Sequence, residues 1–145
     1  MEFSDFAIRL LAAVGAGLII GLERQINHKI AGLRTHTLVA LGSAVFVLLS
    51  LELTKGGEGD VTRIIGQVAT GIGFLGAGVI IHQGMTVHGL TTAATIWCSA
   101  SIGCLAAAGY YKETGLGVGL VVLINFVLHQ VDNWIERKQQ KHIGL

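Results

Sequence analysis

Long apolar segments separated by short polar connections occupy most of this 145-residue chain. A transmembrane helix needs about 20 consecutive, mostly apolar residues to cross the hydrocarbon core of a bilayer. Segments of that kind occur at residues 6–22, 37–53, 61–81, 91–108 and 115–131. The pattern therefore predicts an all-α membrane protein, a compact bundle of five transmembrane helices within residues 1–134, followed by a short charged cytoplasmic tail at residues 135–145.

The composition agrees with a chain embedded in lipid. Hydrophobic residues make up 52% of the sequence and charged residues only 13%, whereas soluble domains are usually about 25% charged. Because so few charges cannot cover a globular surface, we expect the lipid bilayer to solvate most of it. The formal net charge of +1 gives no reason to expect a nucleic-acid partner.

The distribution of basic residues predicts the orientation of the bundle. Cytoplasmic loops carry an excess of lysine and arginine. The first connection and the C-terminal tail hold three such residues each, and the loops on the opposite side hold one each: Arg24, Lys29 and Arg34, then Arg137, Lys138 and Lys141, against Lys55 and Lys112. We therefore predict that the N-terminus is outside and the C-terminus inside, as an odd number of spans requires.

Glycines are concentrated in the centre of the third segment, where Gly71-Ile-Gly-Phe-Leu-Gly76 matches the dinucleotide-binding pattern. That motif also needs an acidic residue about 20 positions later, and none occurs between Asp60 and Glu113. In an apolar helix, glycines instead allow close approach of a neighbouring helix or a break in the helix. The helix-packing candidates in the first and third segments are Gly17, Gly21, Gly71, Gly73, Gly76 and Gly78.

Polar residues form one layer near the predicted outer end of the bundle. Asp60, Arg63 and Gln67 follow one another at helical spacings of three and four, so they share a face of the third span. An arginine in hydrocarbon is costly without a carboxylate. We expect Arg63 and Arg9 to pair with an acidic residue, as an ion pair between helices or as a polar vestibule for a cation or a partner's charge; the acidic candidates are Asp60, Asp5 and Glu52.

A second polar layer lies at the predicted inner end. Glu23 and Arg24 end the first span, and Arg34, Thr35 and His36 begin the second. Further polar residues lie in the third connection and on one face of the fifth segment: His82, His88, Thr91, Thr92, Asn125, His129 and Asp132. Since several elements supply them to one side of a rigid bundle, this layer is a candidate binding region.

Neither layer contains a pattern typical of a metal site or a catalytic site. His82 and His88 have no cysteine or carboxylate between them that would complete a zinc site, and Glu23 and Asp132 alone are few for magnesium. The sequence also lacks a nucleophile elbow and a phosphate-binding loop. We therefore predict no metal, no cofactor and no enzymatic activity.

Several blocks of the sequence resemble the MgtC/SapB family of bacterial inner-membrane proteins. These blocks are Gly21-Leu-Glu-Arg-Gln25, Ala31-Gly-Leu-Arg-Thr-His-Thr37, Asp60-Val-Thr-Arg63, Gly71-Ile-Gly-Phe-Leu-Gly-Ala-Gly78 and Val87-His-Gly-Leu-Thr-Thr-Ala-Ala94. The resemblance implies a multi-pass protein linked to growth in low magnesium and, in pathogens, to intracellular survival. It also implies regulation of another membrane protein, such as the F-type ATP synthase.

The resemblance also indicates partner-binding or ligand-binding residues at positions that match the family blocks. These are Glu23, Arg24, Arg34, Thr35, His36, Asp60, Arg63, Gln67 and Thr91. Longer members of the family append a soluble domain after the last span. Residues 135–145 are too few for such a domain, so we expect either the short, SapB-like form or a truncated longer member.

Two functions are consistent with these observations. The first is a regulator that docks its small-residue faces against another integral membrane protein. The second is a transporter or channel for magnesium, another cation or a small solute. No polar side chain occurs between Thr70 and His82 to join the two polar layers, which favours the regulator. A homodimer stays open as an assembly state.

Overall fold

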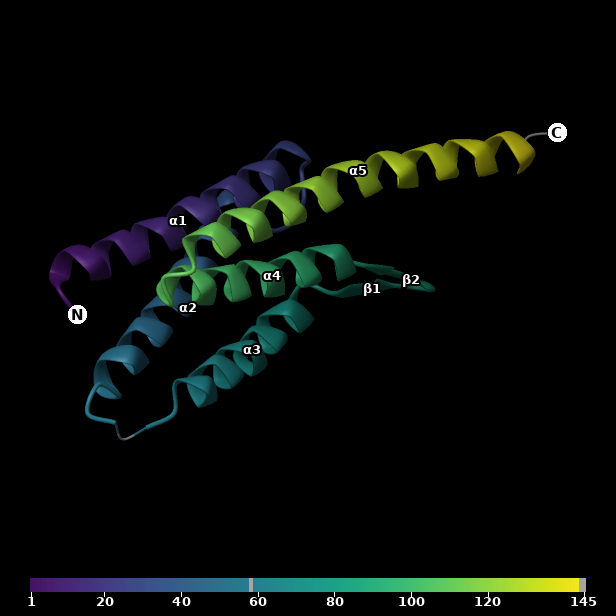
Figure 1. The fold of residues 1–145 in the computed structure, drawn as a ribbon. Coiled ribbons are helices and arrows are strands. Elements are labelled where there is room, and N and C mark those ends of the chain that lie inside the picture. Colours follow the sequence, from purple (N-terminus) through teal and green to yellow (C-terminus); the bar gives the residue numbers. More distant parts are fainter. Residues whose placement is uncertain (58, 144–145) are drawn as a thin grey trace.

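The computed structural model describes residues 1–57 and 59–143, which form five helices and one short hairpin (Figure 1). The predicted all-α bundle is confirmed. Its elements are α1 (Phe3–Ile26), α2 (Leu33–Leu53), α3 (Val61–Gly78), β1 (Ile81–Gln83), β2 (Thr86–His88), α4 (Leu90–Ala107) and α5 (Tyr111–Ile143).

Four of these helices are long and apolar enough to cross a membrane: α1, α2, α4 and residues Tyr111–Asp132 of α5. The 18-residue α3 is not among them in the described part of the chain. It carries Arg63 and Gln67 and contains five glycines, which lower the hydropathy of this short helix. The predicted inside or outside location of the termini stays a prediction.

The third helix ends before the predicted boundary at residue 81. It stops at Gly78, and Ile81 begins a hairpin in which it pairs with His88. The β-branched run from Val79 to Ile81 favours extended backbone. Gly84, with φ of 61°, occupies the first of the two loop positions, where hairpin turns need a positive φ.

The last helix continues well beyond the predicted span of residues 115–131. It runs from Tyr111 to Ile143, so most of the predicted tail is helical and projects past the other helices (Figure 1). No proline or glycine interrupts residues 120–143, and the tail is rich in good helix formers. The side chains of Arg137 and Lys141, used for the predicted orientation, and residues 144–145 lie outside the described part.

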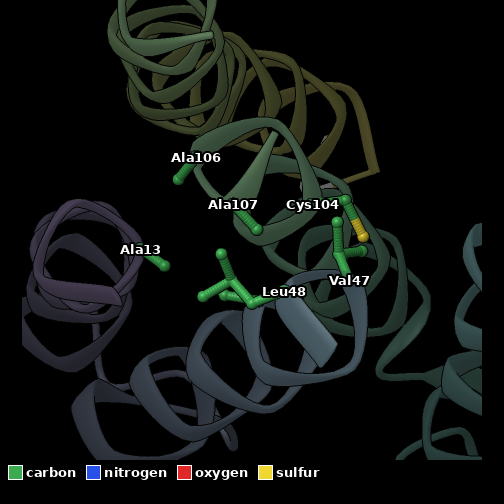
Figure 2. Packing of buried hydrophobic residues seen from close by; sticks show 7 residues of the cluster. Ala13, Val47, Leu48, Cys104, Ala106 and Ala107 are labelled. Carbon is green, nitrogen blue, oxygen red and sulfur yellow. The ribbon is translucent and has the colours of Figure 1, made fainter. Parts of the chain in front are cut away.

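Helices α1, α2 and α4 form the tightly packed part of the bundle. Figure 2 shows Leu48 of α2 pointing toward Ala13 of α1 and Ala107 of α4, all three fully buried. Close packing here depends on small residues. A Cβ added at Gly103 of α4 would overlap the carbonyl oxygen of Ala40 in α2, so these two backbones are in direct contact.

Helix α3 lies at the edge of the bundle, against α4 and, less extensively, α2 (Figure 1). Gly76 is its only buried residue. Helix α5 packs on the other side, against α1 and α4. The chain thus consists of a three-helix core with one helix added on either side.

Candidate functional site

A cavity of about 360 Å³ lies where α1 ends, α4 begins and α5 passes both. We call it the α1/α4/α5 cavity. It is lined by Arg24, His28, Lys29, Ile30, His88, Gly89, Thr91, Thr92, Ile124, Asn125, Leu128, His129 and Asp132. Its polar lining residues come mostly from the inner polar layer that the sequence predicts.

Arg24 is the most buried charged side chain at this cavity, with only 2% of its surface exposed. Its Nη2 donates a hydrogen bond of 3.1 Å to the Oγ1 of Thr92, itself 4% exposed. The Arg24 Nε atom has no hydrogen-bond partner among the described residues. A buried cation with an unused donor is costly unless another group completes its hydrogen bonding.

Glu23, the neighbour of Arg24, connects α1 to α5. The Nδ2 of Asn125 donates to Glu23 Oε2 at 3.1 Å, and the Nδ2 of Asn27 donates to Glu23 Oε1 at 2.6 Å. The carboxylate therefore accepts amide hydrogen bonds on both oxygens. This arrangement holds Asn125 at the cavity wall.

His36 connects α2 to α4 deeper in the bundle and is fully buried. Its Nδ1 lies 2.8 Å from the Oγ of Ser99, which donates to the Thr95 carbonyl oxygen at 2.9 Å. Because the serine hydroxyl has one hydrogen, the imidazole Nδ1–H donates to Ser99. The His36 Nε2 is buried and has no partner in the described part of the chain.

Sequence reasoning placed Thr92 in the inner polar layer but overlooked Thr95 and Ser99. All three are buried polar residues of α4. Their spacings of three and four residues place them on one helix face. A search for polar residues at helical spacing in an otherwise apolar segment would have found them.

The end of α1 positions two further side chains at the cavity. The backbone N–H of Lys29 donates to the Arg24 carbonyl at 3.0 Å, and that of His28 donates to Gln25 at 3.1 Å. This is the Schellman pattern of helix termination, with His28 at the left-handed position (φ 51°) that glycine usually takes. The resulting turn directs His28 and Lys29 to the cavity lining.

Two of the predicted packing glycines bring α2 close to this end of α1. A Cβ on Gly17 would lie 2.7 Å from the His36 carbonyl oxygen, and one on Gly21 would lie 2.7 Å from the Cα of Leu33. Real Cβ atoms do not approach other atoms so closely. Glycine at these two positions is therefore what allows the start of α2 to reach α1.

The remaining predicted inner residues take different positions. Thr91 is exposed but lines the cavity. Arg34 and Thr35 are exposed, do not line it, and make no side-chain hydrogen bond or ion pair with the described residues. The structure thus brings together Glu23, Arg24 and Thr91 around the cavity, with His36 nearby in the core.

At the opposite end of the bundle, Arg9 pairs with Asp5, as expected. Its Nε lies 3.1 Å from the Asp5 carboxylate, and its Nη1 donates to the Ala107 carbonyl oxygen at 2.8 Å. The guanidinium therefore also bonds to the end of α4. Glu52 pairs with the N-terminal amino group and with Lys55 rather than with either arginine.

The pairing predicted for Arg63 is not found. Arg63 is exposed and forms no ion pair with a described carboxylate. Asp60 instead caps α3, accepting from the Thr62 backbone N–H at 2.9 Å. Hydrogen bonds from the Thr62 hydroxyl and then from its N–H hold the pKa of the exposed Asp60 carboxyl below its ordinary value. The Asp60 carboxylate thus caps the N-terminus of α3.

Most of the α3 glycines face no other part of the described chain. A Cβ at Gly71, Gly73 or Gly78 would meet nothing within 4 Å, and one at Gly76 would make ordinary contact with Ala93, 3.6 Å away. Gln67 is exposed and, with Gly71, lines an apolar groove of about 560 Å³ between α2 and α3. A second groove of about 390 Å³ lies between α3 and α4. The packing predicted for Gly71, Gly73 and Gly78 therefore has no partner among the described residues, whereas Gly76 packs against Ala93 of α4.

The lining of the cavity is rich in groups that can donate hydrogen bonds. The described residues contain no group of three or more histidine, cysteine or acidic side chains that could hold a metal ion. The lining instead combines a guanidinium, an ammonium group and three imidazoles with one carboxylate, Asp132.

Comparison with known proteins identifies the family. The MgtC family model matches residues 10–134. The chain is 46% identical over 130 residues to protein MgtC of Salmonella typhimurium, covering 90% of this chain and 55% of that protein. It is 43% identical over 127 residues to protein MgtC of Brucella abortus, covering 88% and 52%. An uncharacterized protein of Synechocystis is 44% identical over 138 residues, covering 95% and 58%.

No solved structure matches the chain. The chain spans between 52% and 58% of the length of these curated relatives. The family model covers most of the chain, including all of α2, α3 and α4, most of α1 and the first part of α5, and the relatives agree with it. This chain belongs to the MgtC family.

Proposed function

We propose that this chain is a non-enzymatic, multi-pass protein of the bacterial inner membrane that regulates another membrane protein by docking α3 against it. The observation that carries the proposal is the uncovered face of α3. Gly71, Gly73 and Gly78 have open space around them, and Phe74 is 83% exposed. A helix this rich in glycine, lying at the edge of the bundle, offers a surface for close helix contact.

The physical chemistry of lipid supports a protein rather than acyl chains as the neighbour of α3. In a bilayer, helices associate through close backbone packing at small residues and through hydrogen bonds between polar side chains. Arg63 and Gln67 are exposed on the same helix, and a charged side chain facing lipid is costly. A partner helix with a carboxylate and an amide would remove that cost.

The partner and the setting that we propose follow from the family resemblance alone. It points to the F-type ATP synthase as the regulated protein, to adaptation to low magnesium, and to intracellular survival in pathogens. Docking would then restrain the synthase through its membrane subunits. A second copy of this chain is the other candidate occupant of the α3 surface, giving a homodimer.

The test compares Gly73→Leu on α3 with Gly15→Leu on α1. Both positions have nothing within 4 Å, so neither leucine should disturb the fold. We expect Gly73→Leu alone to abolish co-purification of the ATP synthase and the effect of the wild-type chain on ATP-driven proton pumping in inverted membrane vesicles. Equal behaviour of the two variants would contradict docking through α3. A doubled mass in detergent that Gly73→Leu abolishes would identify a second copy as the occupant.

Ion or solute transport is the second candidate, favoured by the polar groups that extend from the cavity into the bundle. Arg24, Thr92 and His36 are buried, and the last lies among the core helices. The purified chain in liposomes would then conduct a cation such as magnesium. Flux that is lost in Arg24→Gln would favour transport over docking, whereas its absence in the wild type would contradict transport.

A further inference from the structure

We propose that the α1/α4/α5 cavity binds a phosphate group, carried either by free phosphate or by a phospholipid headgroup. None of the residues lining this cavity belongs to α3. The inference therefore does not depend on the docking surface proposed above. It rests on the charge of the lining, on its unused hydrogen-bond donors and on its shape.

The charge of the lining favours an anion. Arg24 and Lys29 contribute two positive charges, and Asp132 contributes one negative charge. Glu23 does not line the cavity, and both of its carboxylate oxygens accept amide hydrogen bonds. Phosphate oxygens are strong acceptors that pair well with arginine and lysine.

Two sets of hydrogen-bond donors at the cavity are available to a ligand. The first belongs to Arg24, which lines the cavity while 98% buried and whose Nε has no partner among the described residues. The second is the start of α4. Its N-cap residue, Gly89, has no side chain with which to accept hydrogen bonds from the first-turn N–H groups. Such N–H groups, together with the helix dipole, attract anions.

The backbone of Gly89 fixes the start of α4 in this position. Gly89 has φ of 91°, and a Cβ there would overlap the carbonyl oxygen of Val79. A capping serine, threonine or aspartate therefore cannot replace it. The fold leaves the first turn of this 18-residue helix uncapped by its own side chain, directly beside a buried arginine.

His28 adds a donor at a position where backbone geometry favours glycine. It takes the left-handed conformation at the end of α1 and lines the cavity. A non-glycine residue in that conformation carries some conformational cost. The His28 imidazole can donate a hydrogen bond toward the same space as the Lys29 ammonium group.

The size and rim of the cavity fit both sources of phosphate. Its volume of about 360 Å³ is at the lower end of the range of roughly 300–1,000 Å³ typical of ligand pockets. Ile30, Ile124 and Leu128 also line the cavity, and all three are exposed. These apolar side chains would contact the acyl chains of a lipid whose phosphate occupies the polar end, while free phosphate would need the polar end alone.

The experiment measures the thermal unfolding midpoint of the full purified chain in uncharged detergent. In one arm, potassium phosphate is titrated against potassium chloride at matched ionic strength. In the other, phosphatidylglycerol is added to the micelles and compared with diacylglycerol of the same acyl chains, which lacks the phosphate. A ligand that binds the folded state raises the midpoint with its concentration.

Four variants identify the site. Lys29→Gln removes a cation whose side chain makes no hydrogen bond to the described residues, and His28→Gly removes the imidazole while suiting the left-handed backbone. We expect Lys29→Gln to weaken phosphate binding about tenfold, and His28→Gly to weaken it less. Arg34→Gln, the loss of an exposed arginine outside the cavity, should change nothing. Asp132→Asn should tighten binding of an anion, whereas it would weaken binding of a cation.

Each outcome decides the proposal. A free phosphate ligand is supported if inorganic phosphate stabilises the chain, Lys29→Gln reduces this stabilisation and Arg34→Gln retains it. Stabilisation by phosphatidylglycerol alone, with the same variant pattern, supports a lipid headgroup. Absence of stabilisation in both arms, an equal loss in Arg34→Gln and Lys29→Gln, or weaker binding in Asp132→Asn would overturn the phosphate site.

Discussion

Glycines of the three-helix core and glycines of α3 differ in their surroundings. Gly17 and Gly103 lie so close to neighbouring backbone that a Cβ at either position would overlap a carbonyl oxygen or nearly so. Gly73 and Gly78 meet nothing within 4 Å. Glycine at positions 17 and 103 is needed for the packing of the core helices, whereas glycine at positions 73 and 78 is not required by any contact with the described residues.

This difference separates folding from recognition within one small protein. Helices α1, α2 and α4 pack against one another, and each of them carries several buried residues. Helix α3 contributes a single buried residue. Substitutions at glycines of the two regions should therefore have different consequences, and the following predictions measure them.

The largest effect is expected for Gly17→Leu. Its side chain would enter space occupied by the backbone of His36 and Thr37, 2.7 Å from the added Cβ. Since backbone cannot yield like a flexible side chain, we expect a loss of about 3 kcal/mol or more in the free energy of unfolding. Thermal unfolding in detergent measures the loss. A variant as stable as wild type would show that α1 and α2 do not pack as described.

A smaller loss is expected for Ser99→Ala, which tests a polar contact in the same core. It removes the acceptor of the buried His36 Nδ1–H, and a buried unpaired donor costs about 1–3 kcal/mol. Ser101→Ala is the control, because Ser101 is exposed on the same helix and bonds only its own helix backbone. Equal stability of the two variants in chemical unfolding would argue against the His36–Ser99 contact.

On α3, Gly73→Leu should leave stability unchanged or raise it by up to about 1 kcal/mol, since leucine is the better helix former. The surrounding space is open, so no clash offsets this gain. The same unfolding assay as for Gly17→Leu gives the direct comparison. Destabilisation of similar size in both variants would remove the distinction between the two regions.

The smallest effect concerns pH and the start of α3. Because the pKa of Asp60 is lowered in the folded chain, its capping contribution is present above the ordinary pKa of an aspartate and is lost as the pH falls through the lowered value. Amide hydrogen exchange near Thr62 should therefore quicken below that pH. Asp60→Asn keeps an oxygen acceptor but does not titrate. In this variant, amide exchange near Thr62 should therefore show only the intrinsic pH dependence of amide exchange.

Much of the fold could be predicted from hydropathy because lipid requires long, internally hydrogen-bonded apolar helices. Two boundaries were wrong for local reasons. The apolar run through Val79 and Ile81 reads as a continuing span, yet α3 ends at Gly78 and Ile81 begins a hairpin. The polar residues after Val131 read as a tail, yet nothing in their backbone preferences ends α5.

The site was harder to predict because a single sequence does not show which neighbours surround a side chain in the fold. Arg24 and Arg34 look alike as basic residues of the first connection, but one is 98% buried and the other exposed. The difference comes from tertiary packing, which places Thr92 beside Arg24. Likewise, the spacing of Arg63 from Asp60 suggests an ion pair, but the Asp60 carboxylate instead caps the N-terminus of α3.

Arg9 and Arg24 lie near opposite ends of α1, and both bond to α4, through the Ala107 carbonyl oxygen and the Thr92 hydroxyl. A slide of α1 along α4 by one helical turn, about 5.4 Å, would break both bonds at once. Movement of α3 would break neither. The two arginines therefore fix the register of α1 against α4, whereas the position of α3 does not depend on either bond.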